Sequence, residues 1–224
     1  MKNKKILIIV VILTIILILS FTIFKIINYK KIQTGNNISD KTLTQVEDYI
    51  LNISSYDAEI EVEIESNKNK NKYIINQKFC SPNIASQQVI EPKNIEGLTV
   101  KYDGSNLEIS NTKLDLSTIY ENYEYLADNV LWLSDFAQNY RNNGGTINEE
   151  NGIIIMETKK DNSKYSAKEK LYIDRNANKV TKLVIEDENN KSRIYITYNK
   201  IEIGSLNREN VLAFKTDFVK SCDI

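Results

Sequence analysis

Residues 56–66 read YDAEIEVEIES, and the rest of the domain is organised around this stretch. Apolar and acidic side chains alternate along it without a break. The apolar ones are Tyr56, Ala58, Ile60, Val62 and Ile64, and the acidic ones are Asp57, Glu59, Glu61, Glu63 and Glu65. Successive side chains of a β-strand point to opposite faces of the sheet. The alternation therefore predicts a long strand with one buried apolar face and one acidic face.

More segments of this kind follow, separated by short turns. They lie at residues 72–80, 86–91, 98–102, 106–110, 152–157, 169–174, 180–186 and 193–203. Asp103-Gly104-Ser105 and Asn176-Ala177-Asn178 are typical turn sequences. Because such short loops join antiparallel neighbours, we expect about eight antiparallel strands in one long curved sheet.

Two further segments have the spacing of amphipathic helices. The first covers residues 40–53, where Ser39 or Asp40 can act as the N-cap. The second runs over residues 126–140 and is followed by NNGG at 142–145, a typical helix end. The predicted fold class is therefore α+β, with the helices packed on the concave face of the sheet.

The chain begins with an uncharged apolar run from Ile6 to Phe24. A helix over this run, rising about 1.5 Å per residue, spans about 28 Å, which is close to the thickness of the bilayer hydrocarbon. We expect a single-pass membrane anchor over residues 1–28, a polar linker over 29–38 and one domain over 39–224. The short N-terminal tail favours an extracytoplasmic domain, and a cleaved secretory signal is the alternative.

Charge and composition exclude several classes of function. Six of the 29 basic residues lie at or before Lys31, which leaves 23 basic against 30 acidic residues in the domain. This balance does not fit a nucleic-acid-binding surface. The chain has no histidine and only two cysteines, so the commonest general base and the usual zinc ligands are missing. We therefore expect a protein that is not an enzyme and that holds no metal or cofactor.

The acidic face is the first candidate site. Its members are Asp57, Glu59, Glu61, Glu63 and Glu65. A long negative stripe could dock a basic partner. The alternative is a solvated outer face whose charges discourage edge-to-edge pairing of sheets.

Aromatic and cysteine residues supply two further candidates. Trp132, Phe136 and Tyr140 recur at helical spacing and could line a ligand cavity or belong to the ordinary core. Cys80 and Cys222 could form a disulfide that ties down the C-terminal tail, or both could remain thiols.

Three stretches carry a family resemblance: VKYDGSNLEI at 100–109, LYID at 171–174 and KVTKLVIED at 179–187. Together with the order of helices and strands, they resemble the LolA/LolB-like lipoprotein-carrier superfamily over most of residues 56–214. Within that superfamily, the size, the composition and the single membrane signal resemble the clostridial germination proteins of the GerS type.

The resemblance implies a non-enzymatic function. GerS-type proteins bind the sporulation amidase CwlD, which trims cortex peptidoglycan so that muramic-δ-lactam can form. The resemblance thus implies a membrane-tethered partner of a cell-wall amidase, at the cell surface or between the forespore membranes, that supports spore germination. Whether the chain forms a homodimer stays open at this point. GerS itself resembles lipoproteins in having an acylated cysteine, whereas no cysteine precedes Cys80 here.

Two functions remain open at this point. The first is a binding module that regulates a cell-wall amidase and makes its contact through an exposed strand edge. The second is a lipid- or lipoprotein-binding protein with an apolar cavity between sheet and helices. A permanent anchor argues against a carrier that must leave the membrane.

Overall fold

The computed structural model describes residues 38–66, 68–123, 130–160, 168–187, 192–204 and 206–213. Its strands are β1 (Ser55–Glu65), β2 (Lys70–Cys80), β3 (Ile84–Glu91), β4 (Thr99–Tyr102), β5 (Leu107–Asn111), β6 (Leu116–Tyr120), β7 (Gly145–Glu150), β8 (Ile153–Thr158), β9 (Lys168–Asp174), β10 (Lys179–Glu186) and β11 (Arg193–Ile203). Its helices are α2 (Leu43–Leu51), α3 (Leu133–Asn143) and α4 (Arg208–Leu212), and a 3-10 turn, η1 (Thr112–Leu114), precedes β6.

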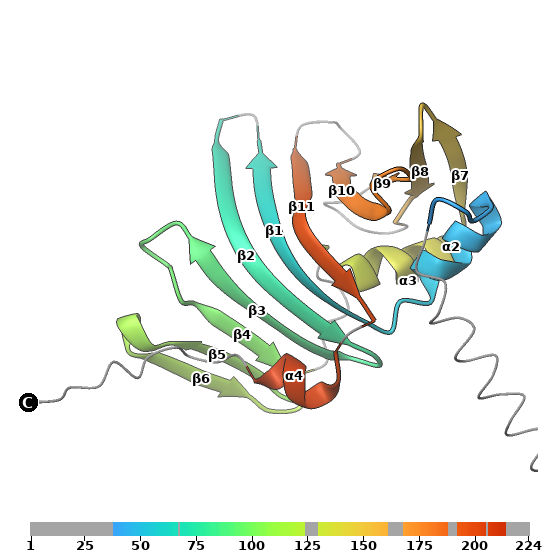
Figure 1. Ribbon diagram of the computed structural model, residues 1–224. Coiled ribbons are helices and arrows are strands. Elements are labelled where there is room, and N and C mark those ends of the chain that lie inside the picture. The colour runs from blue at the N-terminus through green and yellow to red at the C-terminus, as the bar shows by residue number, and fades with distance from the viewer. Residues whose placement is uncertain are drawn as a thin grey trace, which may run out of the picture. The chain divides into compact units, whose positions relative to one another are not determined.

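All these strands form one antiparallel sheet in the order β6-β5-β4-β3-β2-β1-β11-β10-β9-β8-β7 (Figure 1). Strands that are consecutive in the chain are neighbours in the sheet, with the exception of β6 and β7, and at the centre of the sheet the first strand, β1, pairs with the last, β11. The chain therefore builds one half of the sheet outward to β6 and the other half inward from β7. The edge strands β6 and β7 are consecutive in the chain but lie at opposite ends of the sheet.

The apolar side of β1 lies at the centre of the core. Tyr56, Ala58, Ile60 and Val62 are each at most 2% exposed. Ile60 stands opposite Ile75 of β2 and Tyr198 of β11. Full burial of a large apolar side chain contributes about 1.5–3 kcal/mol, so this one face of β1 is a large part of the core.

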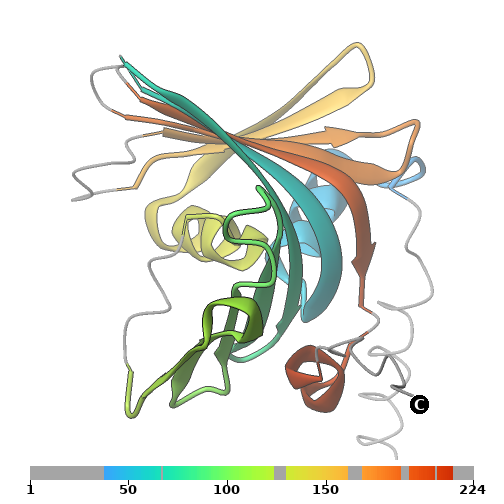
Figure 2. The ribbon, with the colours of Figure 1, turned by 90° about the vertical axis from the view of Figure 1, so that its left-hand side faces the viewer.

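The sheet bends, and its two faces carry different helices (Figure 2). Helix α3 lies on the concave side and packs against α2. Ala85 and Ser86 are neighbours on β3 and so point to opposite faces. Ala85 lines a cavity shared with α3, whereas the Ser86 hydroxyl donates to the Val211 carbonyl oxygen of α4 at 2.5 Å. Helix α4, which the sequence pattern does not predict, therefore lies on the convex side.

The predicted fold class needs correction in the number of strands. Eleven strands form the sheet, not about eight. The sequence pattern predicts neither β6 nor β7. Both are edge strands with mostly exposed side chains, so no buried face imposes an alternation on their sequences.

Helix α2 begins at Leu43, and its N-cap is Thr42 rather than Ser39 or Asp40. Thr42 and Gln45 form a capping box. Thr42 Oγ1 accepts a hydrogen bond from the Gln45 amide at 3.3 Å, and Gln45 Oε1 accepts one from the Thr42 amide at 3.0 Å. This reciprocal pair satisfies two amides that a helix start otherwise leaves without partners, which places the helix start here.

Helix α3 begins at Leu133, although the sequence predicts a helix from residue 126; residues 124–129 lie outside the described part of the chain. Its N-cap, Trp132, has an extended backbone and makes no side-chain capping bond. The buried Tyr56 hydroxyl accepts a hydrogen bond from the Leu133 amide at 3.2 Å instead. A side chain of β1 thus caps α3 and attaches it to the sheet.

The predicted membrane anchor from Ile6 to Phe24 lies outside the described residues. Among the residues that are described, no helix combines the length and the apolar character needed to cross a bilayer. The predicted boundaries of anchor, linker and domain stay predictions.

We expect Tyr56→Phe to lower the free energy of unfolding by about 1–2 kcal/mol, because the buried Leu133 amide loses its acceptor while the ring is kept. Urea denaturation followed by circular dichroism measures this difference. Tyr120→Phe is the matched control, because its side chain is 48% exposed. The control should change stability by less than about 0.5 kcal/mol. A Tyr56→Phe variant as stable as the wild type would contradict the capping role.

Candidate functional site

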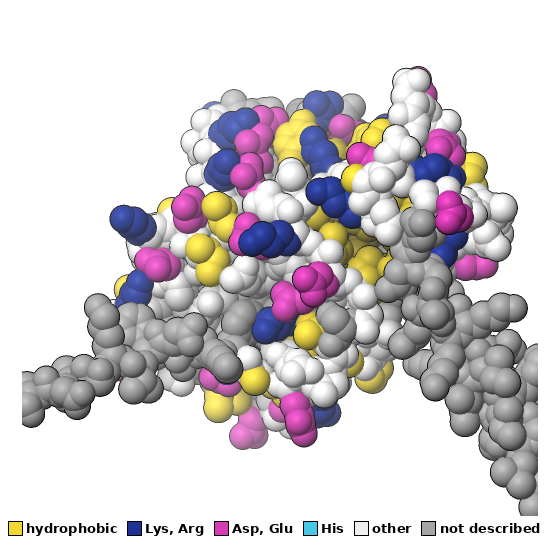
Figure 3. Space-filling model, in the orientation of Figure 1, with side chains coloured by type: hydrophobic (Ala, Val, Ile, Leu, Met, Phe, Trp, Pro, Cys, Tyr) yellow, Lys and Arg dark blue, Asp and Glu magenta, His cyan; other side chains and the backbone are white. Residues whose placement is uncertain are grey.

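The acidic face of β1 points away from α3, and lysines of β2 lie beside it. Lys70 Nζ is 2.6 Å from a Glu63 carboxylate oxygen and 3.0 Å from one of Glu65. Lys72 Nζ is 2.8 Å from a Glu61 oxygen. Figure 3 shows basic and acidic side chains side by side on the face that it draws.

Three lysines of β2 pair with four of the five carboxylates and so offset part of the negative charge of the acidic face. Lys78 Nζ lies 3.8 Å from an Asp57 oxygen at the other end of the strand. The hydrogen bond from Lys70 lowers the pKa of Glu63 and raises the pKa of Lys70 to about 12. Because these pairs are exposed to solvent, they contribute little to stability. The carboxylates therefore do not form a bare negative stripe, and their role in docking a basic partner stays a prediction.

The three predicted aromatic residues are all buried, with exposed fractions of 4% for Trp132, 1% for Phe136 and 4% for Tyr140. The Phe136 and Tyr140 ring centroids are 6.0 Å apart, and those of Trp132 and Tyr56 are 6.4 Å apart. Trp132 lines a cavity beside α3, and Phe136 and Tyr140 are not among the lining residues of that cavity. The structure thus places Phe136 and Tyr140 in the core and Trp132 between core and cavity.

The cavity lies between α3 and the concave face of the sheet and has a volume of about 160 Å³. Its inner wall consists of buried side chains from β2, β3, β4 and α3, namely Phe79, Ala85, Tyr102, Trp132 and Ala137. Asn83, Gln138 and Arg141 contribute exposed polar side chains to the outer wall. Binding sites for drug-sized molecules usually enclose about 300–1,000 Å³, so this cavity suits only a small group.

A buried polar cluster attaches α3 to β9. Glu169 is 1% exposed, and its carboxylate accepts hydrogen bonds from Asn139 Nδ2 at 3.0 and 3.2 Å. Lys160 Nζ lies 3.6 Å from the carboxylate of Asp135, one turn before Asn139 on α3. Burial raises the pKa of Glu169 to about 7, against the lowering effect of the Asn139 hydrogen bond. Within the described residues, no group of three or more histidine, cysteine or acidic side chains could hold a metal.

The edge strand β6 carries an apolar surface that the sequence analysis missed. The exposed large apolar side chains of the described residues all lie on β6 or η1: Leu114 (55% exposed), Leu116 (39%), Ile119 (63%) and Tyr120 (48%). Strand β6 pairs with β5 on one side and has no partner strand on the other among the described residues. Its sequence, LSTIY, carries no charge in a chain with 26% charged residues, which is the signal that could have identified it.

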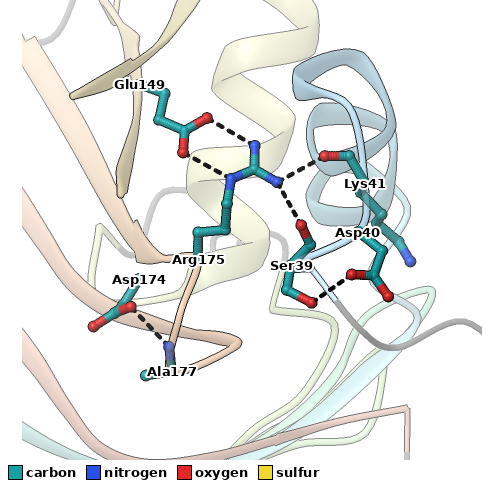
Figure 4. Close-up of polar contacts among 7 residues, drawn as sticks. All are labelled: Ser39, Asp40, Lys41, Glu149, Asp174, Arg175 and Ala177. Carbon is teal, nitrogen blue, oxygen red and sulfur yellow. Dashed lines mark hydrogen bonds and ion pairs between the residues drawn. The ribbon is translucent and has the colours of Figure 1, made fainter. Parts of the chain in front are cut away.

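The opposite edge strand, β7, is protected against pairing with another chain. Strand β7 ends in Glu149 and Glu150, and α2 packs against it. Arg175 forms a two-pronged ion pair with Glu149, with both nitrogen–oxygen distances at 2.8 Å. Its remaining nitrogen, Nη1, donates to the carbonyl oxygens of Ser39 and Lys41 at 3.2 and 2.7 Å (Figure 4). Charges and an attached chain segment protect β7 in the way that natural edge strands usually are protected, whereas no such protection of β6 is found within the described residues.

Cys80 ends β2 on the face opposite to Phe79, and its side chain is half-buried. Helix α4 packs against β2 and β3 on that same face. Cys222 lies outside the described residues, so the predicted disulfide stays a prediction.

No protein-family model and no curated protein sequence matches the chain. Among solved structures, it is similar to a chain in the structure of the CwlD amidase from Clostridioides difficile in complex with the GerS lipoprotein. The sequences are 24% identical, the match covers 73% of this chain and 96% of that chain, and the TM-score is 0.46. It is also similar to a LolA superfamily protein from Nitrosomonas europaea, with 9% identity, 76% and 97% covered, and a TM-score of 0.44. An uncharacterized conserved protein from Thermus thermophilus gives 10% identity, 79% and 96% covered, and a TM-score of 0.49.

The two resemblances predicted from the sequence, to GerS and to the LolA superfamily, thus both occur among the similar solved structures. None of these three TM-scores exceeds 0.49. Likenesses this weak carry no argument about function, which has to be inferred from the chain's own residues.

Glu169→Gln is expected to raise the free energy of unfolding at pH 8 and to change it little near pH 4. The folded-state pKa of Glu169 is about 7, and the unfolded-state value is about 4.3. The stability contributed by the protonated group is therefore fully present below about pH 4.3 and is lost as the pH rises through about 7. Glutamine keeps an acceptor for Asn139 and cannot ionise, so we expect a gain of about 1–3 kcal/mol at pH 8.

Urea denaturation at pH 4 and pH 8 measures this effect, with the exposed Glu150→Gln as the matched control. The control removes the same charge from a solvated position and should show the same small difference at both pH values. A Glu169→Gln variant that is no more stable than the wild type at pH 8 would contradict the claim that the buried Glu169 carboxylate destabilises the protein when it is ionised.

Proposed function

We propose that this chain is a non-catalytic binding module that docks a partner protein on the edge strand β6, and that the partner is a cell-wall amidase. The observation that carries the proposal is the exposed, uncharged edge of β6, where the exposed large apolar side chains of the described residues gather. An open strand edge with apolar side chains is a template for pairing with another chain.

Strand addition explains why these groups occur together. The unpaired backbone amides and carbonyls of an edge strand supply affinity, and side chains at alternate positions supply specificity. Leu116 and Tyr120 share the concave face with Leu107, while Ile119 points to the convex face. A partner strand laid along β6 would therefore meet apolar side chains on both faces of the extended sheet.

The amidase is the partner that the sequence resemblance implies. The extracytoplasmic location expected from the sequence would bring the chain into the compartment of such an enzyme. Because β6 is uncharged, the matching segment of the amidase should be apolar and uncharged as well. Regulation of the amidase, and through it of cortex modification and germination, belongs to the same proposal.

The lipid-binding alternative receives less support. The cavity between α3 and the sheet measures about 160 Å³, and sites for larger ligands enclose about 300 Å³ or more. Its outer wall carries polar and charged side chains rather than a continuous apolar lining. We therefore propose the binding module alone.

Ile119→Lys tests the proposal directly. A charge at the edge blocks strand addition without disturbing a buried contact, since Ile119 is 63% exposed. We expect the affinity of the full-length chain for the co-expressed cell-wall amidase of the same organism to fall at least about tenfold, which corresponds to about 1.4 kcal/mol. Biolayer interferometry on the detergent-solubilised proteins measures the affinity.

Thr146→Lys on the guarded edge β7 is the matched control, because it adds the same charge to an exposed position. It should leave binding within about twofold of the wild type, and both variants should keep the wild-type circular-dichroism spectrum. Binding that survives Ile119→Lys and is lost in Thr146→Lys would show that the docking edge has been assigned to the wrong side of the sheet. Absence of any complex with the wild type would refute the amidase as partner.

A further inference from the structure

We propose that β6 binds its partner through the backbone groups of two residues, Ser117 and Ile119, and that it selects an uncharged strand whose side chains toward the concave face are apolar. This inference rests on the function proposed above. It specifies which groups of the edge make the contact and which kind of amidase segment fits them.

The turn between β4 and β5 fixes the direction of the backbone groups. The Asp103 amide donates to the Asn106 carbonyl oxygen at 3.2 Å, so these two residues form a hydrogen-bonded pair. Hydrogen-bonded pairs alternate with other pairs along an antiparallel ladder. The even-numbered residues of β5 therefore direct their backbone groups to β4, and the odd-numbered residues direct theirs to β6.

A second hydrogen bond gives the same alternation. The Val89 amide of β3 donates to the Leu98 carbonyl oxygen, next to β4, at 2.9 Å. Followed through the registers of β3 with β4 and of β4 with β5, this bond again directs the odd-numbered residues of β5 to β6.

The odd-numbered residues of β5 stand opposite Leu116, Thr118 and Tyr120 of β6. Those three residues therefore use their backbone groups in the ladder with β5. Ser117 and Ile119 direct theirs to the open edge, where no strand of the described residues pairs with them (Figure 1). Each has one amide and one carbonyl oxygen, so the edge offers a partner strand two donors and two acceptors.

A row of side chains on the concave face runs from the core to this edge. Its members stand opposite one another on successive strands: Tyr56, Phe79, Ala85, Tyr102, Leu107 and Tyr120. The first five are at most 8% exposed, whereas Tyr120 is 48% exposed. Among the described residues the row ends at Tyr120. Because directly opposite side chains contact one another, a residue of the partner strand would extend the row and cover Tyr120.

The concave side of β6 thus defines the segment that fits. Leu116, 39% exposed, lies on the same side as Tyr120, with Thr118 between them. A charge laid against Leu116 or Tyr120 would lose its water without gaining a partner. The amidase segment should therefore carry apolar side chains opposite Leu116 and Tyr120, at alternate positions of an extended strand, and no charge between them.

Ser117→Pro removes one outward amide. Proline is tolerated on an edge strand where the missing N–H would face solvent. We expect the affinity of the full-length chain for the co-expressed amidase, measured by biolayer interferometry, to fall at least about tenfold. Ser117→Ala is the matched control, because it removes the hydroxyl and keeps the amide, and it should stay within about twofold of the wild type. Both variants should keep the wild-type circular-dichroism spectrum.

Hydrogen–deuterium exchange read out at single residues by mass spectrometry tests the assignment even if Ser117→Pro fails to fold. In the free wild-type chain, the amides of Thr118 and Tyr120 should exchange more slowly than those of Ser117 and Ile119. Binding of the amidase should slow the exchange of Ser117 and Ile119 at least about tenfold. The amidase segment that becomes protected should be the uncharged strand described above.

Three results would overturn the inference. Exchange that does not alternate along β6 in the free chain would contradict the outward direction of Ser117 and Ile119. A protected amidase segment that is charged or helical would contradict the selection. Undiminished binding of a folded Ser117→Pro variant, with binding lost in Ile119→Lys, would mean that side chains alone make the contact, and the proposed function would stand. Absence of any complex with the wild type would instead refute the proposed function, and this inference with it.

Discussion

The antiparallel pairing of β1 with β11 is the contact on which this arrangement depends. It joins the first and last strands of the sheet, so both edges have to be made by the middle of the chain. The segment between those edges crosses the concave face as α3, and the Tyr56 hydroxyl of β1 caps that helix. The central strand therefore holds both halves of the sheet and the helix that covers them. Because these contacts join residues far apart in the chain, we expect folding to be slow for a domain of this size.

Burial decides how much of this fold the sequence predicts. Strand β1 is predicted because its apolar face is buried, which imposes a period of two on the sequence. Strands β6 and β7 bury almost nothing and carry no such period, so they are missed. The start of α3 is predicted too early because its cap comes from Tyr56, more than seventy residues away. A capping box within the chain, as at Thr42 and Gln45, leaves a local signal, but a tertiary cap leaves none.

The candidate sites, too, are predicted where they depend on a local pattern and missed where they depend on tertiary structure. The carboxylates of β1 lie on the outer face as the alternation predicts, but their neutralisation follows from the register of the β1–β2 hairpin, which places Glu63 opposite Lys72 and Glu65 opposite Lys70. That register could have been inferred from the turn between the two strands. The uncharged sequence LSTIY marks the apolar segment, but its exposure follows only from the position of β6 as the last strand of the sheet.

Hydrogen–deuterium exchange of the full-length chain, alone and with the amidase, tests the docking edge most directly. Complex formation should slow exchange in peptides covering residues 116–120, because the outer amides of β6 acquire strand partners. Peptides covering residues 145–150 of β7 should exchange at unchanged rates. Protection confined to β7 or to the charged outer face of β1 and β2, with β6 unchanged, would contradict the account.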